Sequence, residues 1–488
     1  MRKKKKTEQQ EINDEKLQRK RNKKTNREMA IVTYLFLGLF LVMIGFLVKF
    51  LAGDMNALLN NQYNKRQDLL AEQITKGSIL SANGKILAKT ETDKNGKETR
   101  YYPYGEVFAH VVGRSVNGKT GLEAAESYTM LTTNVNPVYG TINQLKGEKN
   151  PGNNVVTTLH ENLQKTAYQA MGSNKGAVVV MEPSTGKILA MVSTPSYDPN
   201  TVSRDWERLT SQRSENSALY NRATQGLYPP GSTFKLLMSL EYLRENQSLS
   251  DFKYRCTGKI GTGTDIIRCY GNSVHGTLTL ERAFAKSCNT AFASIGTGLK
   301  IKDWTKLCNS LYFNKTLPIS MEQKKASFTL KEGEADAIIR QTAIGQGDTL
   351  VTPLQNLLLV AACENDGKIM KPYVIDRIED AYGNVVRQTE PEVMSSPITE
   401  EEASELKTLM EATVKYGTAT ALNYGSYHAG GKTGSAEFKL GSTESHSWFI
   451  GFAEKNGKKL VVSIIGEGAG TGSRFAVPVA RKIFDAYW

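Results

Sequence analysis

The sequence predicts an N-terminal transmembrane helix, then a small α+β domain, then a larger α/β domain. The chain has 488 residues, too many for one ordinary domain. One uncharged, almost wholly apolar run at 30–48 is long enough to cross a bilayer. Beyond about residue 155, helical patterns alternate with hairpin patterns, and the predicted strands cluster at both ends of this region. We therefore expect one sheet that joins distant parts of the sequence.

A basic tail precedes the apolar run. Residues 1–29 hold twelve Lys or Arg and five Asp or Glu, so this tail carries more than half of the net charge of +13. The run is longer than the apolar core of a signal peptide, and Lys49 can snorkel and let the span reach Ala52. By the positive-inside rule we predict a cytoplasmic tail at 1–29, a transmembrane helix at 30–52 and an external body. The tail then sets topology and does not bind nucleic acid.

The external part of the chain divides near residue 154. Asn83-Gly84 lies between two short apolar runs, which is the strongest short signal for a hairpin. A mixed turn and helix pattern follows at 101–131, and Pro151 to Asn154 is rich in turn residues. We predict a small domain at 53–154 and a larger domain at 155–488.

Periodicity predicts the elements of the larger domain. The expected helices are 161–171, 201–213, 232–246, 278–300, 302–311, 353–364, 398–414 and about 475–487. The expected strands are a hairpin around Ser184, then 372–379, 427–438, 445–454 and 458–465.

The motif Ser232-Thr233-Phe234-Lys235 follows a Pro-Pro-Gly turn and opens a predicted helix. Residues three apart share one face of a helix, so Ser232 and Lys235 are expected to point the same way. A serine hydroxyl needs a base to become a nucleophile, and a lysine serves if burial or a second cation favours its neutral form. A second copy, Ser184 to Lys187, falls in a hairpin turn, where we expect it to be solvated and inert.

Two further motifs follow in order. Ser287-Cys288-Asn289 falls at a break between two helical patterns, and Lys432-Thr433-Gly434-Ser435 belongs to a predicted strand. Chance copies of these motifs occur at 214–216 and 119–121, so each triplet alone carries little information. The ordered set Ser-x-x-Lys, Ser-x-Asn and Lys-Thr-Gly is the combination found in penicillin-binding proteins and class A β-lactamases.

With these motifs the chain resembles the class B penicillin-binding proteins, which are membrane-anchored peptidoglycan D,D-transpeptidases. The resemblance implies a pedestal, or dimerisation-like, domain at 53–154 and a serine transpeptidase domain at 155–488, with a central antiparallel sheet flanked by helices. It also rests on 77–79, 83–84, 87–88, 109–113, 176–180, 185–191, 198–200, 221–223, 345–347, 352–353 and 447–451. The chain departs from the family at Lys76 and at Ser81-Ala82, which concerns packing of the pedestal and not the chemistry.

The resemblance implies a serine acyl-enzyme mechanism. Ser232 would be the nucleophile and Lys235 its base. Lys432 would be the second cation that lowers the pKa of Lys235, and it would attract the C-terminal carboxylate of the substrate. Ser287 would relay a proton to the leaving nitrogen, and Asn289 would hold a peptide amide.

The remaining substrate contacts are expected from the strand that carries Lys-Thr-Gly. The hydroxyls of Thr433 and Ser435 would bind the substrate carboxylate, with Gly434 between them. Ser435 stands where the family more often has threonine, and the hydroxyl is retained. The backbone N–H groups of Ser232 and Ser435 would form the oxyanion hole.

The implied function is the crosslinking of peptidoglycan stem peptides in cell wall synthesis during growth or division, with β-lactams binding covalently to Ser232. The stretch 53–154 is too short for the glycosyltransferase domain of bifunctional relatives, so a polytopic glycosyltransferase and other division or elongation proteins are expected partners. The alternatives are a β-lactam-hydrolysing or β-lactam-sensing protein of the same fold, or a non-catalytic scaffold of the wall-synthesis machinery. No cofactor is expected.

Five cysteines and five histidines show no spacing typical of a zinc site, so we expect no metal. Cys256 and Cys269 flank a predicted hairpin, and an external location permits either a disulfide or two free thiols. Cys288 is expected to be a small buried residue. Cys308, Cys363 and the histidines are expected to be structural, and Trp448 to pack or to line the cleft.

Overall fold

The computed structural model describes residues 2–61, 64–213, 217–437 and 444–488. They form two units, residues 1–64 and residues 65–488, which are described separately. In the first unit, α1 (Arg2–Lys49) carries both the basic tail and the apolar run. A π-helical stretch, η1 (Phe50–Asp54), and the short α2 (Met55–Leu59) continue it. The predicted span 30–52 therefore crosses from α1 into η1.

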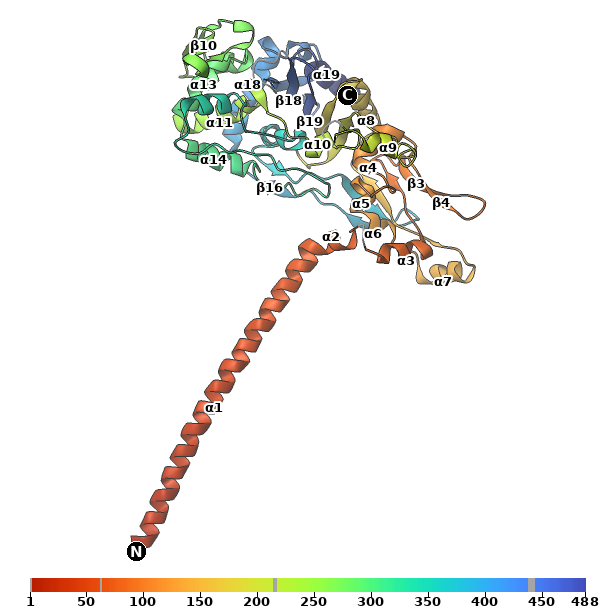
Figure 1. Cartoon of the computed structure of the whole chain (residues 1–488), viewed down its shortest axis with the longest axis vertical. Helices are drawn as coiled ribbons and strands as arrows, with labels where there is room; N and C mark the ends of the chain where they lie inside the picture. The colour runs from red at the N-terminus through yellow and green to blue at the C-terminus, as the bar shows by residue number, and fades with distance from the viewer. Residues whose placement is uncertain (1, 62–63, 214–216, 438–443) are drawn as a thin grey trace. The chain divides into compact units, whose positions relative to one another are not determined.

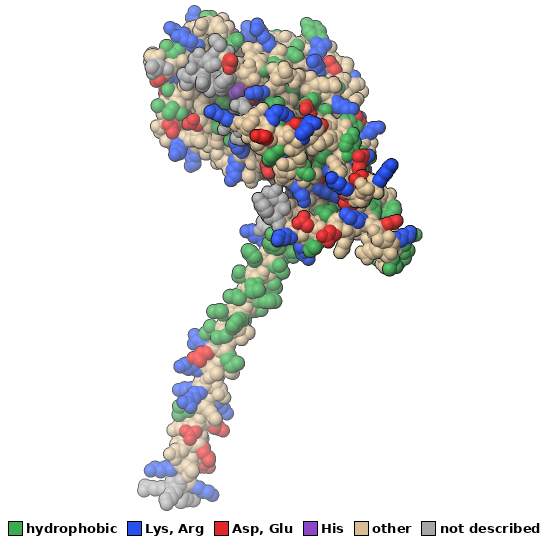
Figure 2. Space-filling model, turned by 45° about the vertical axis from the view of Figure 1, so that its right-hand side comes forward, with side chains coloured by type: hydrophobic (Ala, Val, Ile, Leu, Met, Phe, Trp, Pro, Cys, Tyr) green, Lys and Arg blue, Asp and Glu red, His purple; other side chains and the backbone are tan. Residues whose placement is uncertain are grey.

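Helix α1 is, within the described part of the chain, the one helix long and apolar enough to cross a membrane. Its apolar side chains form a continuous band beyond the charged tail (Figure 2). This pattern is that of a single-pass membrane protein.

The second unit contains a six-stranded sheet in the order β15-β14-β6-β2-β3-β4. The predicted hairpin at Asn83-Gly84 is confirmed, because it joins β2 (Ile79–Leu80) to β3 (Ile86–Thr92). The other strands are β4 (Glu98–Tyr101), β6 (Asn154–Thr157), β14 (Ile375–Glu379) and β15 (Val385–Gln388). Three of these strands, namely β6 from Val155 onward, β14 and β15, come from the predicted larger domain and complete the pedestal sheet, with Ile378 opposite Val155.

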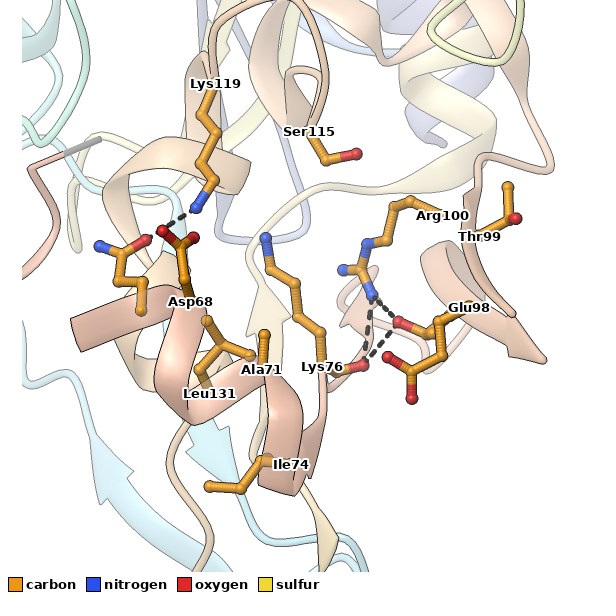
Figure 3. A pocket seen from close by; sticks show the side chains of 12 residues that line it. Asp68, Ala71, Ile74, Lys76, Glu98, Thr99, Arg100, Ser115, Lys119 and Leu131 are labelled. Atoms are coloured by element: carbon orange, nitrogen blue, oxygen red, sulfur yellow. Dashed lines mark hydrogen bonds between the residues drawn. The ribbon is translucent and has the colours of Figure 1, made fainter. Parts of the chain in front are cut away.

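Short helices surround this sheet. They are α3 (Arg66–Gln73), α4 (Ala109–Val112), α5 (Gly121–Ala125), α6 (Ser127–Met130) and α7 (Pro137–Leu145). Glu123 in α5 is fully buried, and its carboxylate accepts hydrogen bonds of 2.6 Å from Lys76 Nζ and from Arg100 Nε. Lys76 therefore supplies a cation to a buried ion-pair cluster. Figure 3 shows Lys76, Arg100 and Lys119 around a pocket of about 200 Å³, which contains none of the three motifs.

The larger sheet has five strands, all antiparallel, in the order β17-β18-β19-β7-β8. They are β17 (His428–Glu437), β18 (Ser445–Lys455), β19 (Lys458–Gly466), β7 (Gly176–Met181) and β8 (Ile188–Thr194). These bounds confirm the predicted hairpin around Ser184 and the predicted strands near the C-terminus, although position 438 of the expected strand 427–438 lies outside the described residues.

Helices cover both faces of this sheet, so its strands are buried on both sides (Figure 1). Val178 and Val180 pack with α8 (Glu161–Met171) and α19 (Ala476–Tyr487). Ala177 and Val179 face the opposite core, which includes α11 (Lys235–Asn246), α13 (Asn289–Gly298), α17 (Leu358–Cys363) and α18 (Glu400–Tyr416). The predicted class, an antiparallel sheet flanked by helices, is confirmed.

Several predicted helices are shorter or divided. The stretch 201–213 forms helix only at α9 (Trp206–Thr210), because Thr201 Oγ1 donates to Asp205 Oδ2 at 2.8 Å and stabilises turns before it. The stretch 278–300 divides into α12 (Leu280–Ala285) and α13, as the break at Ser287 indicated, and 353–364 divides into α16 (Pro353–Asn356) and α17. Helix α14 (Ile301–Ser310) agrees with the prediction.

Other elements were not predicted. They are α10 (Arg222–Gln225), α15 (Asp336–Ala343), β1 (Ile74–Thr75), β5 (Asn150–Pro151), β9 (Tyr254–Cys256), β10 (Lys259–Ile260), β11 (Ile267–Arg268), β12 (Gly276–Leu278), β13 (Ile369–Met370) and β16 (Val393–Ser395). Most are too short to leave a periodic pattern in the sequence.

Candidate active site

Ser232 lies in η4 (Gly231–Phe234), a 3₁₀ turn that leads into α11 at Lys235. The α-helix thus begins three residues later than predicted, and Ser232 is half-buried. Gly231 has φ +53°, and its N–H donates to Gly345 O at 2.8 Å. A Cβ atom at Gly231 would lie 3.0 Å from the Cβ atom of Ala436 in β17. Glycine at 231 therefore lets the nucleophile turn approach β17 closely.

Lys235 is fully buried and joins the first two motifs. Its Nζ donates to Asn289 Oδ1 at 2.7 Å, to Ser287 O at 2.9 Å and to Ser287 Oγ at 3.3 Å. Ser287 lies between α12 and α13 with φ +56°, a conformation that a residue with a side chain adopts only when its surroundings hold it there. These contacts confirm that the break between the two helical patterns places Ser287 and Asn289 beside Lys235.

Burial lowers the pKa of Lys235 to about 7. Of the two causes that the sequence offered, burial and a second cation, the structure supports burial: removal of the ammonium group from water lowers the pKa, and the contribution expected from Lys432 is not among the causes. Lys432 is also fully buried, and its pKa is lowered well below the usual value by burial and by repulsion from Lys235. The electrostatic repulsion expected between the two lysines therefore contributes to the lowered pKa of Lys432.

The third motif lies on β17, an edge strand of the larger sheet. Lys432 Nζ donates to Thr433 O at 3.0 Å, and the hydroxyls of Thr433 and Thr418 share a hydrogen bond. A Cβ atom at Gly434 would lie 2.9 Å from the Cβ atom of Trp448, so this position has no room for a side chain. On an edge strand alternate N–H groups point away from the neighbouring strand, and such groups are available to a ligand.

Trp448 is fully buried and has a packing role. Its Nε1 donates to Pro229 O at 3.0 Å, which ties β18 to the segment that enters the nucleophile turn. Its indole ring also packs edge-on against Tyr228, with ring centroids 6.1 Å apart. Trp448 therefore holds the nucleophile turn against the larger sheet. This agrees with packing, one of the two roles predicted for it.

The chance copies of the motifs do not form a site. Ser184 is exposed in the turn between β7 and β8, and Lys187 pairs with Asp376 at 3.1 Å. Lys119 donates to Gln67 Oε1 at 2.7 Å in the pedestal. The copy at 214–216 lies outside the described residues. The Ser-x-x-Lys motif at Ser232 is therefore the copy that contacts the Ser-x-Asn motif, whereas Lys187 of the second copy pairs with Asp376.

Glu467 is a supporting residue that the sequence analysis missed. Its Oε1 accepts hydrogen bonds of 2.7 Å from Arg222 Nε and of 2.7 Å from Tyr228 OH. Arg222 is fully buried, and Tyr228 stands just before the turn that carries Ser232. Glu467 follows β19 while Arg222 begins α10, so no spacing along the chain could have revealed the pair.

The cysteines agree with the predictions of buried, structural residues. All five are free, so of the two alternatives for Cys256 and Cys269 the structure has the free thiols. Spacing along the chain indicated no zinc site, but the fold brings four potential metal ligands together. The side chains of Cys256, Cys269, His275 and Cys288 meet with their ligand atoms all within 4.8 Å of one another. The fold brings the strand pairs β9–β12 and β10–β11 together with the Ser-x-Asn turn. The spacing of these four residues along the chain does not indicate that they meet.

The arrangement has the parts of a serine acyltransferase: a half-buried serine, a buried lysine with a lowered pKa, a second hydroxyl and an edge strand. Family models agree with this class. Residues 176–485 match the penicillin-binding protein transpeptidase domain, and residues 76–155 match the penicillin-binding protein A dimerisation domain.

Known proteins are similar over most of the chain. It is 32% identical over 451 residues to the peptidoglycan D,D-transpeptidase PbpA of Mycolicibacterium smegmatis, covering 86% of this chain and 90% of the relative. It is 27% identical to the peptidoglycan D,D-transpeptidase MrdA of Acinetobacter baumannii, covering 80% of this chain and 66% of that protein.

Solved structures are similar too. A ceftriaxone acyl-enzyme complex of penicillin-binding protein A from Mycobacterium tuberculosis superposes with a TM-score of 0.78 at 28% identity, covering 86% of this chain and 99% of that one. A D,D-transpeptidase domain from Eggerthella lenta gives a TM-score of 0.76 at 28% identity, covering 84% of this chain and 97% of that one. The chain belongs to the penicillin-binding protein transpeptidase family. With its dimerisation domain and apolar N-terminal helix it is a class B penicillin-binding protein.

Proposed function

We propose that this protein is a peptidoglycan D,D-transpeptidase in which Ser232 is the nucleophile and Lys235 its base. One observation carries the assignment. Lys235 is buried beside the nucleophile turn, its pKa is lowered to about 7, and its Nζ contacts both polar residues of the Ser-x-Asn motif. A lysine in this state is neutral in a large fraction of molecules at neutral pH, so it can accept a proton from a serine.

In the first step, neutral Lys235 takes the hydroxyl proton of Ser232 while Ser232 Oγ attacks the carbonyl carbon of the D-Ala-D-Ala bond. The N–H groups of Ser232 and Ser435 stabilise the oxyanion, and each such donor typically contributes about 100- to 1,000-fold in rate. Ser287 Oγ, 3.3 Å from Lys235 Nζ, passes the proton on to the leaving nitrogen. The C–N bond breaks, and the terminal D-alanine leaves as a neutral amine.

In the second step, an amine of a neighbouring stem peptide attacks the acyl-enzyme. Lys235 accepts the proton of that amine and returns it to Ser232 Oγ as the ester bond breaks, which leaves a new peptide crosslink. A β-lactam undergoes only the first step, because its leaving nitrogen stays attached to the opened ring and blocks the incoming amine. Ser232 then remains acylated.

The edge strand β17 binds the substrate. The hydroxyls of Thr433 and Ser435 and the Nζ of Lys432 hold the C-terminal carboxylate, Gly434 keeps the strand close to the nucleophile turn, and Asn289 holds a peptide amide. Because burial and Lys235 hold the pKa of Lys432 well below its usual value, the arriving carboxylate favours the charged form of Lys432.

The basic tail at 1–29 supports an orientation with the N-terminus in the cytoplasm and the catalytic unit outside the membrane. Residues 76–155 match the penicillin-binding protein A dimerisation domain, and we infer that polymerisation belongs to another protein. A polytopic peptidoglycan glycosyltransferase therefore supplies the glycan strands, and other division or elongation proteins act with it.

The test is a transpeptidation assay with the full-length protein in detergent, supplied with glycan strands from a separate glycosyltransferase. Wild type is expected to release D-alanine and form crosslinked muropeptides, and Ser232→Ala to do neither. Ser184→Ala, in the second Ser-x-x-Lys, is the matched control and is expected to behave as wild type. Crosslinking that survives in Ser232→Ala would contradict the assignment, and so would a protein that only hydrolyses β-lactams.

A further inference from the structure

Four potential metal ligands from three segments converge beneath the Ser-x-Asn turn. Cys256 ends β9, Cys269 follows β11, His275 precedes β12, and Cys288 lies between α12 and α13. The three cysteines are 1%, 2% and 0% exposed, and the four ligand atoms all lie within 4.8 Å of one another. None of the steps assigned to the transpeptidase uses Cys256, Cys269 or His275.

The distances agree with tetrahedral coordination. Cys269 Sγ lies 3.7 Å from Cys256 Sγ and 3.7 Å from Cys288 Sγ, and Cys256 Sγ lies 3.4 Å from His275 Nδ1. A tetrahedral zinc ion with Zn–S near 2.3 Å and Zn–N near 2.0 Å places its sulfur ligands about 3.8 Å apart and a sulfur and a nitrogen about 3.5 Å apart. A disulfide would require sulfur atoms at about 2.05 Å.

Hydrogen-bond donors lie around the sulfur atoms, as they do in metal sites with thiolate ligands. The N–H of Gly258 donates to Cys256 Sγ at 3.4 Å, and the Thr290 hydroxyl donates to the same sulfur at 3.2 Å. The Thr290 hydroxyl also lies 3.4 Å from Cys288 Sγ. Such outer contacts orient metal ligands and stabilise the negative charge on sulfur.

We propose that Cys256, Cys269, Cys288 and His275 bind one Zn²⁺ ion. Each of the three thiols loses its proton to solvent, and His275 binds through Nδ1 as the neutral imidazole, so the occupied site carries one net negative charge. Three thiolates and one imidazole in a tetrahedron select zinc among the divalent ions. An iron–sulfur cluster would need the ligands farther apart, because each thiolate would bind a different iron.

The site holds the catalytic turn in place. Cys288 stands between Ser287 and Asn289, and Asn289 Nδ2 donates to the carbonyl of Arg268, the residue before Cys269. The metal would therefore tie the turn that contacts Lys235 to the hairpins at 254–278. All four tetrahedral positions are filled by protein ligands, which is the pattern of structural zinc sites. Cys256, Cys269 and His275 are positioning residues in this account.

The test is the metal content of the full-length protein, purified in detergent without chelators and measured by mass spectrometry of the elements. We expect about one zinc per chain in wild type and almost none in Cys256→Ser and in Cys269→Ser. Cys308→Ser and Cys363→Ser are matched controls, because both cysteines are buried outside the cluster. Both controls should keep their zinc.

Wild-type protein provides a second readout that does not depend on how the variants fold. Replacement of zinc by Co²⁺ should give the visible absorption of tetrahedral cobalt with thiolate charge-transfer bands. Removal of zinc should lower Tm and slow acylation by penicillin, and added Zn²⁺ but not Mg²⁺ should restore both. Wild type that neither contains nor binds zinc would overturn the proposal, as would a Cys256–Cys269 disulfide or zinc that persists in Cys256→Ser. Because zinc content is measured without any substrate, these outcomes are independent of the transpeptidase assignment.

Discussion

The rate at which penicillin acylates this protein should be controlled by one proton on Lys235. Burial lowers the pKa of Lys235 from 10.5 to about 7. At pH 7 the neutral fraction of this lysine therefore rises from roughly one in 3,000 to about one half, a gain of about 1,500-fold. Only neutral Lys235 can accept the proton of Ser232. The acylation rate constant should fall about tenfold per pH unit below about pH 6 and become constant above about pH 8.

The assay is the second-order rate constant for acylation by a fluorescent penicillin, measured on the full-length protein from about pH 5 to about pH 9. Circular dichroism at each pH separates loss of the base from loss of the fold. Lys235→Arg should lose acylation at every pH, because arginine stays protonated. Lys187→Ala, in the solvated copy of the motif, should leave the midpoint unchanged. A rate that does not change across this range, or a midpoint near that of an exposed lysine, would refute a neutral Lys235 as base.

Two further predictions concern the fold. Glu123→Ala removes the buried carboxylate that pairs with Lys76 and Arg100 and should lower the free energy of unfolding in urea by about 3–5 kcal/mol, whereas the same change at the exposed Glu91 should cost less than about 1 kcal/mol. Equal costs would contradict the buried cluster. Gly345 and Gly347 have φ of +76° and +77°, but only at Gly345 would a Cβ atom collide, at 2.0 Å, with a backbone oxygen of the nucleophile turn. Gly345→Ala should therefore destabilise the protein by at least ~2 kcal/mol more than Gly347→Ala, and it should slow acylation. Equal Tm values for the two variants would be inconsistent with the close approach of Gly345 to Gly231.

The catalytic motifs could be predicted because each is a short local pattern. A serine three residues before a lysine at a turn–helix junction brings both side chains to one side, and a break between two helices exposes polar residues such as Ser287 and Asn289. The decisive property of Lys235, its burial, comes from helices and strands distant in the sequence. The sequence could therefore single out Lys235 as the candidate base, but it could not decide whether burial or a second cation lowers its pKa.

What the sequence could not predict depends on long-range contacts. Strand β6, at the start of the predicted larger domain, pairs with β2 of the predicted small domain and with the distant β14, so the two predicted domains share a sheet. Glu467 meets Arg222 only because β19 and α10 pack together. Cys256 and Cys288 meet because the hairpins fold over the Ser-x-Asn turn, and their spacing resembles no known metal motif. Each case lacks a local periodicity or a short spacing from which it could be inferred.

If Ser232 is the nucleophile, a β-lactam acylates Ser232 and no other residue. The most direct measurement is the intact mass of the full-length protein after incubation with penicillin G, followed by peptide mapping. We expect one drug molecule per chain, located on Ser232, absent in Ser232→Ala and present in Ser184→Ala. An adduct on another residue, an adduct that persists in Ser232→Ala, or consumption of the drug without an adduct would contradict it.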